Sequence, residues 1–280
     1  MRHSNGLATL LDNGLITDVV RPLLSGKEAQ VYLVISDGEE RVAKVYKDAT
    51  ERSFKKRAVY TEGRRGRNSR DRRAMAKGSR HGRAKDEAAW RSAEVDMIYR
   101  LRDAGVRVPT PYHFDDGVLV MELVQDEDGE PAPRLGEVDM DAATAELIFD
   151  QLIREVVKML CAGVVHGDLS DFNVLMAADG PVVIDFPQSM DAAGNQSARK
   201  ILIRDVANLN NFLLGFGPTK RPLFHAQEMW ALYARGELLP DTPLTGTYSA
   251  AANDVDLQAL LVELEEDERD ELRRRGGLPS

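Results

Sequence analysis

Hydrophobic side chains in the first half of the chain mostly follow a strand-like period, interrupted by two helix-like stretches. Leucines spaced by three and four positions within residues 1–17 predict a short leading helix. Apolar residues at every fourth position predict a second helix from Asp86 to Leu101, which Pro109 and Pro111 break. Strands are predicted, with a hairpin turn at 36–40, over residues 18–23, 25–34 (a turn and a strand), 41–46 and 118–124.

Helix-like spacing dominates the second half of the chain, around one short hairpin. Apolar runs at 174–176 and 182–184, separated by turn residues at 178–181, predict the two strands of that hairpin. The buried strand at 118–124 continues into an acidic connection at 125–130, which is typical of a hinge between two lobes. Helices are predicted from the spacing of apolar residues over 141–162, 199–212, 222–235 and 254–275.

The composition is that of an ordinary globular protein. The chain has 280 residues, 43% hydrophobic and 30% charged, enough for one large domain or two lobes with a sizeable core. Its single cysteine, Cys161, excludes an intramolecular disulfide and a cysteine-cluster metal site. No apolar run has the length that spans a bilayer, and residues 1–6 lack the apolar core of a secretory signal. We therefore expect a cytoplasmic protein with no membrane partner.

Positive charge is concentrated in one segment of an otherwise acidic chain. Residues 51–85 carry 14 Lys and Arg against 3 acidic residues, whereas the net charge of the whole chain is −9. The segment has few large apolar residues and cannot build a core, so we expect much of it to be mobile. Excess cationic charge favours a nucleic-acid partner, such as rRNA or a pre-ribosomal particle. A phosphorylated loop that gates the substrate, or a solvated loop without a partner, stays open as an alternative.

Three oxygen-bearing side chains flank the predicted hairpin. Asp168 and Asn173 precede its first strand and Asp185 follows its second, so we expect the three to lie close together. Mg2+ prefers hard oxygen ligands and keeps several waters, so Asn173 and Asp185 are enough to hold it. Asp168 is then the candidate base for an attacking hydroxyl. Ordinary turn residues would explain the Asp-x-x-x-x-Asn spacing alone, but Ile-Asp-Phe at hairpin distance favours the functional interpretation.

These two loops carry a family resemblance. The run His166-Gly167-Asp168-Leu169-Ser170-Asp171-Phe172-Asn173, with Ile184-Asp185-Phe186-Pro187-Gln188-Ser189, resembles the catalytic and metal loops of the RIO family of atypical serine/threonine protein kinases, in its Rio-one-like branch. Gly167 stands where standard protein kinases have Arg, and Pro187 stands where they have Gly. The resemblance implies an α+β, two-lobed, protein-kinase-like fold without a long activation segment. It implies a β-rich N-lobe over 1–123, with a leading helix and a mobile basic loop at about 50–86, and a mainly helical C-lobe over 124–280.

The resemblance also implies what the site binds. Such proteins use ATP with Mg2+, for which Mn2+ can substitute. Asp168, Lys44 and Asp185 would be catalytic, and Asn173 and Asp185 would hold the metal. The residues implied to contact the nucleotide are Ser25, Gly26, Lys27, Glu28, Ala29, Lys44, Glu94, Met121, Glu122 and Val124.

Three of the charged candidates also have plainer interpretations. Lys44 shares a strand face with apolar Val42, and an inward lysine needs an anionic partner, for which Glu94 is the candidate. A solvent-exposed lysine on an edge strand and a solvent-exposed glutamate are the alternatives. Asp205 is a candidate anchor for the backbone of the catalytic loop, or a surface aspartate.

Three functional hypotheses follow. The first is an ATP- and magnesium-dependent RIO-type serine/threonine protein kinase that phosphorylates a protein substrate or itself, with ATPase cycling in ribosome maturation as an extension. The second is an RNA- or ribosome-binding assembly ATPase with little kinase activity. The third is a small-molecule phosphotransferase of the aminoglycoside or choline kinase type, against which Ser170-Asp171-Phe172 and Pro187-Gln188 argue.

Overall fold

The structure, a computed structural model, describes residues 5–26, 29–47, 94–217 and 224–248. Several predictions lie outside the described residues. They are Lys27 and Glu28, the basic loop at about 50–86, the predicted start of a helix at Asp86, and the helix at 254–275.

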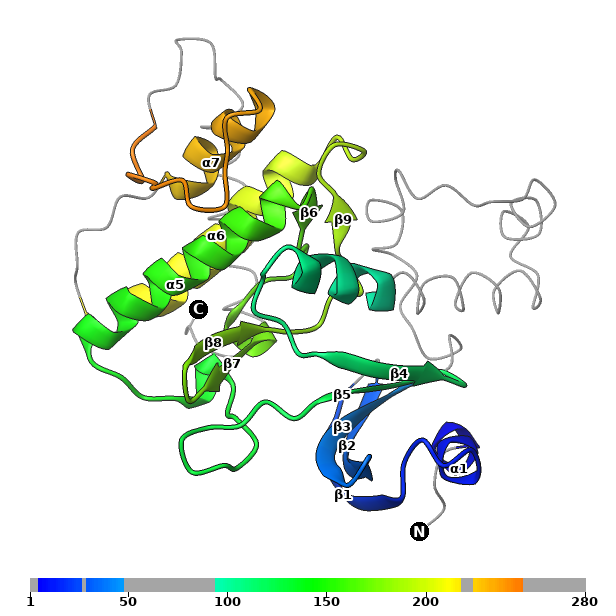
Figure 1. Cartoon of the computed structure of the whole chain (residues 1–280). Helices are drawn as coiled ribbons and strands as arrows, with labels where there is room; N and C mark the ends of the chain where they lie inside the picture. Colours follow the sequence, from blue (N-terminus) through cyan, green and yellow to red (C-terminus); the bar gives the residue numbers. More distant parts are fainter. Residues whose placement is uncertain (1–4, 27–28, 48–93, 218–223, 249–280) are drawn as a thin grey trace, which may run out of the picture.

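The N-lobe is built on an antiparallel five-stranded sheet in the order β1-β2-β3-β5-β4 (Figure 1). β3 lies in the middle of this sheet, paired with β2 on one side and β5 on the other. A lysine on β3 therefore cannot be an edge-strand residue. The strands are β1 (Asp18–Ser25), β2 (Ala29–Ser36), β3 (Glu39–Tyr46), β4 (Pro111–Asp115) and β5 (Val118–Glu122).

Strand β4 was not among the predicted strands, although its turn carries a clear signal. Asp116 and Gly117 connect β4 to β5 with φ angles of 43° and 73°. Asp37 and Gly38 connect β2 to β3 in the same way, with φ angles of 53° and 80°. Two left-handed residues form the tight turn that matches strand twist, and Asp-Gly is a favoured pair for it. The second Asp-Gly pair was therefore a usable hairpin signal.

The two faces of the sheet have different roles. α1 (Asn5–Asp12) covers one face, where Leu7 and Leu10 pack with strand residues such as Val34 and Val118. α1 is shorter than the helix predicted within residues 1–17. The opposite face is turned toward the C-lobe and carries a second apolar cluster of Leu33, Val42 and Leu123, with Leu23, Val31 and Met121 packed against it.

A helix covers residues 94–103 beside the sheet and leads into β4. It ends two residues beyond the predicted Leu101 and well before the prolines, at a point where Gly105 adopts a left-handed φ of 74° and Gly105 N–H donates to the Arg102 carbonyl. The segment that follows is fastened to the C-lobe. Arg107 N–H donates to buried Glu155 at 2.8 Å, and the Arg107 carbonyl accepts from Val183 N–H at 2.9 Å.

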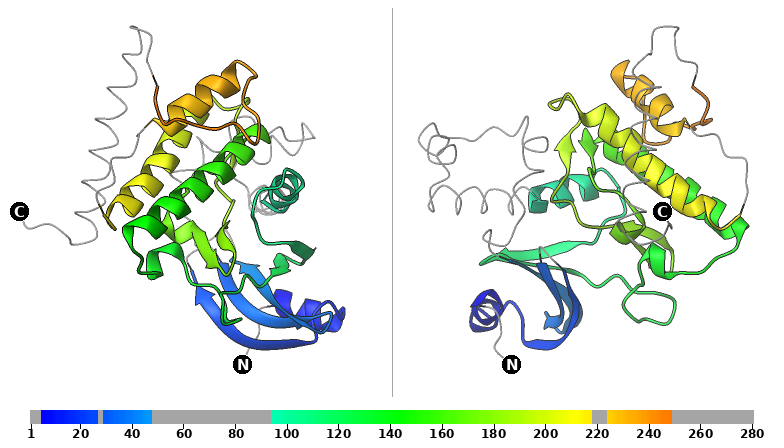
Figure 2. Two further views of the ribbon diagram at one scale, coloured as in Figure 1. Left: turned by 60° about the vertical axis from the view of Figure 1, so that its left-hand side comes forward. Right: turned by 180° about the vertical axis from the view of Figure 1, so that it is seen from behind.

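In the described part of the C-lobe, three helices pack around the larger of the apolar clusters. These helices are α5 (Ala142–Cys161), which Asp141 caps, α6 (Ala198–Leu214) and α7 (His225–Ala234). Figure 2 shows α5 and α6 side by side. Shorter elements complete the lobe: η3 (Leu135–Glu137), β6 (Val164–Val165), η4 (Asp171–Asn173), β7 (Val174–Ala177), β8 (Gly180–Val183) and β9 (Met190–Asp191). The prediction of an α+β fold is confirmed.

The central hairpin is tighter than predicted. β8 already begins at Gly180, so Ala178 and Asp179 alone form the turn between β7 and β8. Gly180 has a φ of 122°, which explains why a turn residue can open a strand here. Separately, no helix in the described part of the chain is both long and apolar enough to cross a membrane.

Candidate active site

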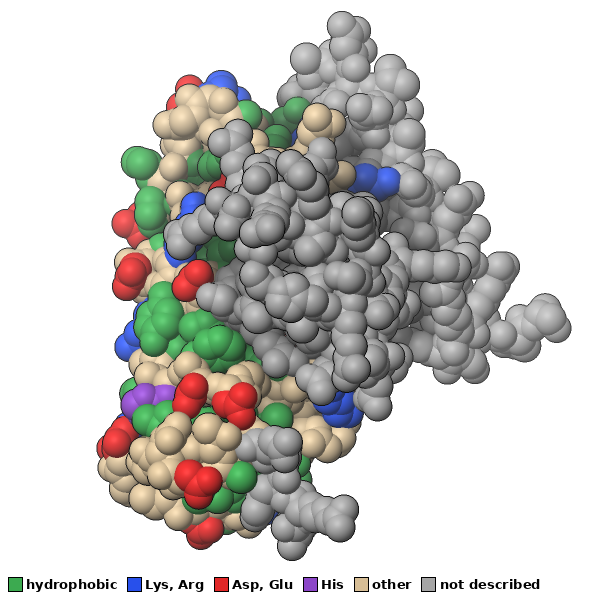
Figure 3. Space-filling view, turned by 90° about the vertical axis from the view of Figure 1, so that its right-hand side faces the viewer, with side chains coloured by type: hydrophobic (Ala, Val, Ile, Leu, Met, Phe, Trp, Pro, Cys, Tyr) green, Lys and Arg blue, Asp and Glu red, His purple; other side chains and the backbone are tan. Residues whose placement is uncertain are grey.

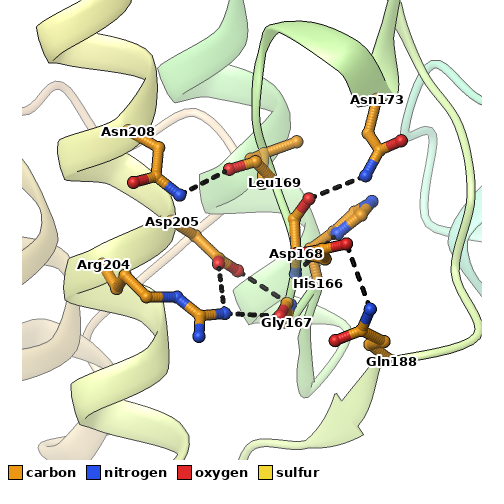
Figure 4. A network of polar contacts seen from close by, with 9 residues as sticks. All are labelled: His166, Gly167, Asp168, Leu169, Asn173, Gln188, Arg204, Asp205 and Asn208. Atoms are coloured by element: carbon orange, nitrogen blue, oxygen red, sulfur yellow. Dashed lines mark hydrogen bonds and ion pairs between the residues drawn. The ribbon is translucent and has the colours of Figure 1, made fainter. Parts of the chain in front are cut away.

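The loop between β6 and β7 is held by hydrogen bonds to its backbone from α6. Asp205 accepts from Gly167 N–H at 2.8 Å, Arg204 donates to the Gly167 carbonyl, and Asn208 donates to the Leu169 carbonyl at 3.2 Å (Figure 4). Gly167 has a φ of 89°, a conformation that side chains disfavour, so glycine suits this position. The loop that carries Asp168 is therefore fixed by its own lobe.

Asp205 is a buried anchor rather than a surface residue. Its side chain is 1% exposed, so the surface interpretation was wrong and the anchor interpretation holds. Burial raises the pKa of Asp205 to about 7, although Arg204 and the Gly167 N–H partly offset this. Arg204 approaches the carboxylate at 3.3 Å. The anchor of the loop is therefore itself titratable near neutral pH.

His166 links this loop to the strand end that precedes Asp185. Its Nε2 lies 3.0 Å from the Ile184 carbonyl, and its Nδ1 accepts from Asp168 N–H at 3.2 Å. A carbonyl only accepts hydrogen bonds, so Nε2 carries the proton and Nδ1 is free to accept. Burial lowers the pKa of His166 to about 4, so the ring is neutral at physiological pH.

Asp168, the candidate base, has both its backbone and its carboxylate engaged. Asn173 Nδ2 donates to the Asp168 carbonyl at 2.8 Å, and Gln188 Nε2 donates to Asp168 Oδ2 at 3.0 Å. In Figure 4 the amides of Asn173 and Gln188 approach Asp168 from opposite sides. The predicted closeness of Asp168 and Asn173 is therefore observed.

Asp185 meets the N-lobe through Lys44. Lys44 Nζ donates to Asp185 Oδ1 at 2.6 Å and to Glu94 Oε1 at 2.8 Å. Lys44 and Glu94 have side chains only 12% and 2% exposed, so the solvent-exposed interpretations of both residues were wrong. Asp185 adopts a φ of 71°, an uncommon conformation for a non-glycine residue that often marks functional sites. Residues 50 and 141 positions from Lys44 in sequence thus meet at one ammonium group.

Lys44, Asp185 and Glu94 shift one another's pKa values. Burial alone would lower the pKa of Lys44, but Asp185 and Glu94 outweigh it and raise that pKa well above its ordinary value. Burial likewise opposes ionisation of Asp185, yet Lys44 holds the pKa of Asp185 below its usual value. Burial raises the pKa of Glu94, and Lys44 offsets only part of this. Lys44 and Asp185 are therefore both charged at neutral pH.

The donor set beside Asp185 fits a hard divalent cation. Asn173 uses its Nδ2 on the Asp168 carbonyl, so its amide oxygen is directed elsewhere (Figure 4). Asn173 and Asp185 lie at the two ends of the hairpin, which Ile184 N–H closes by donating to the Asn173 carbonyl at 3.0 Å. One carboxylate, 41% exposed, and one amide oxygen suit Mg2+, which retains several waters.

A nucleotide base would find an apolar surface next to Lys44. The cluster of Leu33, Val42 and Leu123 lies on the same face of the sheet as Lys44, because Val42 and Lys44 alternate on β3. Val31 is the register partner of Lys44 on β2. The predicted hinge residues Met121, Glu122 and Val124 lie at the end of β5 and just beyond it, and the Val124 carbonyl accepts from Ala132 N–H at 2.9 Å.

The turn between β1 and β2 supplies part of the predicted phosphate loop. Gly26 N–H donates to the Ala29 carbonyl at 2.9 Å, which closes a tight turn after Ser25. Lys47 donates to the Gly26 carbonyl at 2.6 Å, a contact that no pattern in the sequence indicates. Lys47 directly follows β3, so a second lysine, besides Lys44 on that strand, contacts this turn.

Sequence reasoning also missed Gln188, Arg204 and Asn208. All three contact the loop that carries Asp168, and all three come from beyond the hairpin. Arg204 and Asn208 are spaced by four, which places them on one helix face with Asp205 between them. That spacing was the only local signal for them, since their partners lie more than 35 positions away in sequence.

A family model described as the RIO domain matches residues 30–224. The chain belongs to the RIO domain family. The match begins in β2 and includes Lys44, both loops and α6. The suspected family is therefore confirmed, whereas the roles of individual site residues remain predictions.

Relatives of this RIO chain are curated as protein kinases. The human serine/threonine-protein kinase RIO1 is 33% identical over 210 residues, which cover 74% of this chain and 35% of the human protein. The RIO-type serine/threonine-protein kinase Rio1 of Haloferax volcanii is 34% identical over 205 residues, covering 72% of this chain and 66% of that protein. The match thus spans from about a third to two thirds of these relatives.

A solved RIO structure supports the fold. The crystal structure of the Rio2 kinase–ADP/Mg2+–phosphoaspartate complex from Chaetomium thermophilum is similar with a TM-score of 0.53 at 21% identity. The likeness covers 94% of this chain and 75% of that one. The predicted two-lobed, protein-kinase-like fold is therefore confirmed.

Proposed function

We propose that this chain is an ATP- and magnesium-dependent RIO-type serine/threonine protein kinase that transfers the γ-phosphoryl group to a protein hydroxyl, its own hydroxyls included. The observation that carries the proposal is Lys44 Nζ, held at 2.8 Å by Glu94 and at 2.6 Å by Asp185. A buried lysine oriented by a helix glutamate beside an aspartate of the other lobe is the arrangement that protein kinases use around nucleotide phosphates.

The residues divide into a nucleotide side and a metal side. Lys44 binds phosphate oxygens and Glu94 orients it. Asn173 and Asp185 would hold Mg2+, or Mn2+ in its place, and a bound metal supplies charge neutralisation on the phosphoryl oxygens. The turn after Ser25 would cover the phosphates with backbone N–H groups. Lys27 and Glu28 are proposed to take part, although both lie outside the described residues. The adenine edge would bond the Glu122 carbonyl and the Val124 N–H, against the apolar face of the sheet.

Asp168 serves the acceptor. Its carboxylate accepts the hydrogen of the acceptor hydroxyl, orients the oxygen for attack and takes the proton. Its backbone is held by Asn173 and His166, so the geometry exists before the acceptor arrives. Most of the rate acceleration would come from this positioning and from charge neutralisation, as phosphoryl transfer requires.

The experiment is transfer of radiolabel from γ-labelled ATP with Mg2+, scored as phosphoprotein and free phosphate together. Asp168→Ala removes the base, and Asp185→Asn removes the carboxylate that would hold the metal. We expect each to lower phosphoprotein formation by about a hundredfold or more. Asp150→Asn, an exposed α5 residue, is the matched control and should transfer at the native rate. Native rates in both site variants would overturn the proposal.

An ATPase switch in ribosome maturation is the second candidate. Two observations favour it: the 41% exposure of Asp185, which makes it accessible as a phosphoryl acceptor, and the +11 charge of residues 51–85, which suits rRNA. Figure 3 shows acidic and basic side chains interspersed over the described part of one face, so the nucleic-acid argument rests on the basic segment. Free phosphate that RNA stimulates, without stable serine or threonine label, would favour this candidate.

A further inference from the structure

Gln188, which follows the hairpin, touches the carboxylate of the candidate base. Its Nε2 lies 3.0 Å from Asp168 Oδ2. A carboxylate can only accept, so the amide nitrogen must be the donor. Figure 4 shows the amide aimed at Asp168 from the side opposite Asn173. Neither binding of the nucleotide nor binding of the metal, as proposed, uses Gln188.

The turn that carries Gln188 is anchored on both sides. Ser189 N–H donates to the Phe186 carbonyl at 3.0 Å, which closes a four-residue turn with Pro187 in the position where proline is favoured. Phe186 and Ser189 are buried, and the Phe186 ring packs 5.0 Å from the His166 ring. The half-buried amide of Gln188 is thus presented by a segment with little freedom to move.

The contact has a chemical consequence for Asp168. An aspartate carboxylate turns easily about its last bond, so both oxygens compete for the acceptor unless one is occupied. The hydrogen bond from Gln188 to Oδ2 resists this rotation, so it fixes the plane of the carboxylate and the direction in which the group meets an acceptor hydroxyl. The bond is also charge-assisted and therefore stronger than a neutral one.

We propose that Gln188 is a positioning residue that orients the Asp168 carboxylate toward the acceptor hydroxyl. The inference rests on the proposed function and adds a second task for the segment 185–188. Asp185 at its start serves the metal, and Gln188 three positions later serves the base. The short turn after β8 therefore connects the proposed metal ligand Asp185 with the proposed base Asp168.

The test compares three substitutions in the full chain. Gln188→Leu removes the donor at similar size, Gln188→Asn keeps an amide too short to hold the 3.0 Å bond, and Gln188→Glu keeps the shape but repels the carboxylate. We expect kcat to fall about tenfold to a hundredfold for Leu and Asn, with the KM for ATP and the Mg2+ dependence unchanged. We expect Glu to be the most impaired. A packing role would give the reverse order, because Glu is the closest match in shape.

A double-mutant cycle and a matched control complete the design. Adding Gln188→Leu to Asp168→Ala should cost nothing further, because the amide then has no carboxylate to orient. Gln151, a half-buried glutamine on α5, is the control: Gln151→Leu and Gln151→Glu should keep the native kcat. Native kcat in Gln188→Glu, or a KM for ATP that changes together with kcat in Gln188→Leu, would overturn the inference.

The same data distinguish a failure of the proposed function from a failure of the inference on Gln188. If Asp168→Ala transfers phosphate at the native rate, the proposed function fails. If Asp168→Ala is inactive while all Gln188 variants match the native protein, only the inference on Gln188 fails.

Discussion

The two key aspartates of the site are held in opposite ways. Asp168 sits on a loop whose backbone is bonded to α6 and to Asn173, all within the C-lobe. Asp185 follows a strand of the same lobe, but its charge partner is Lys44, from the sheet of the N-lobe. Among the described residues, the loop of the proposed base is therefore held by hydrogen bonds within the C-lobe, whereas the proposed nucleotide side depends on how the two lobes meet. This difference separates the effects expected from mutations on either side.

The largest effect is expected from Lys44→Met, because Lys44 is the charge partner of Asp185 from the other lobe. The substitution leaves Glu94 buried without its partner, and breaking a buried pair in this way costs about 3–5 kcal/mol of unfolding free energy. Transfer of label should also fall to background. Urea unfolding at neutral pH measures the first effect and γ-labelled ATP the second.

The control for that prediction removes both charges. Lys44→Met with Glu94→Gln leaves a neutral amide where an unpaired carboxylate would be, so we expect part of the lost stability to return without activity. If the double variant is less stable than Lys44→Met alone, an unpaired Glu94 carboxylate is not what destabilises the single variant.

A smaller, pH-dependent effect distinguishes the anchor of Asp168 from that of Asp185. The pKa of Asp205 is raised to about 7, so the folded protein keeps a proton that the unfolded chain loses near pH 4. Stability from this group is therefore present at low pH and is lost as pH rises toward 7, by about 1.4 kcal/mol per unit of pKa difference. Asp185 gives no such loss, because Lys44 keeps its pKa low.

Asp205→Asn isolates that effect. Between pH 5 and 7 we expect the unfolding free energy of the variant to fall less, or rise more, with pH than that of the native protein, because the contribution of Asp205 is gone. His166, whose pKa is lowered, contributes a slope of opposite sign and Glu94, whose pKa is raised, one of the same sign, and both remain in the two proteins. An unchanged slope in the variant would mean that Asp205 is not the group responsible. Asp179→Asn, at an exposed ion pair with Arg107, should keep the native slope.

The smallest expected effect is at the edge of the same network. Asn208→Ala removes one bond, from Nδ2 to the Leu169 carbonyl at 3.2 Å. We expect a loss of about 1 kcal/mol in unfolding free energy and less than about a tenfold loss of kcat, with the KM for ATP unchanged. A change in the KM for ATP would show that the loop of Asp168 is coupled to the nucleotide side after all. Steady-state kinetics and urea unfolding of the one variant provide both measurements.

Local sequence patterns were enough for much of this protein. Alternation and helical spacing predicted β5, α5, α6 and α7 close to their observed bounds. The hairpin between Asn173 and Asp185 followed from two apolar runs and a turn. Strand β4 was the main omission, and its Asp116-Gly117 turn was a signal that went unused.

The tertiary structure decided which charged residues are buried and what they touch. The strand of Lys44, taken alone, favoured a solvent-exposed lysine on an edge strand, and only sheet order settled that β3 is internal. Asp205 and Gln188 look like ordinary polar residues until α6 and the turn after β8 bring them to Gly167 and Asp168. A repeating pattern reports the contacts a residue makes with near neighbours in sequence. The burial and pairing of a charge depend on groups far along the chain, which come together only when the whole chain packs.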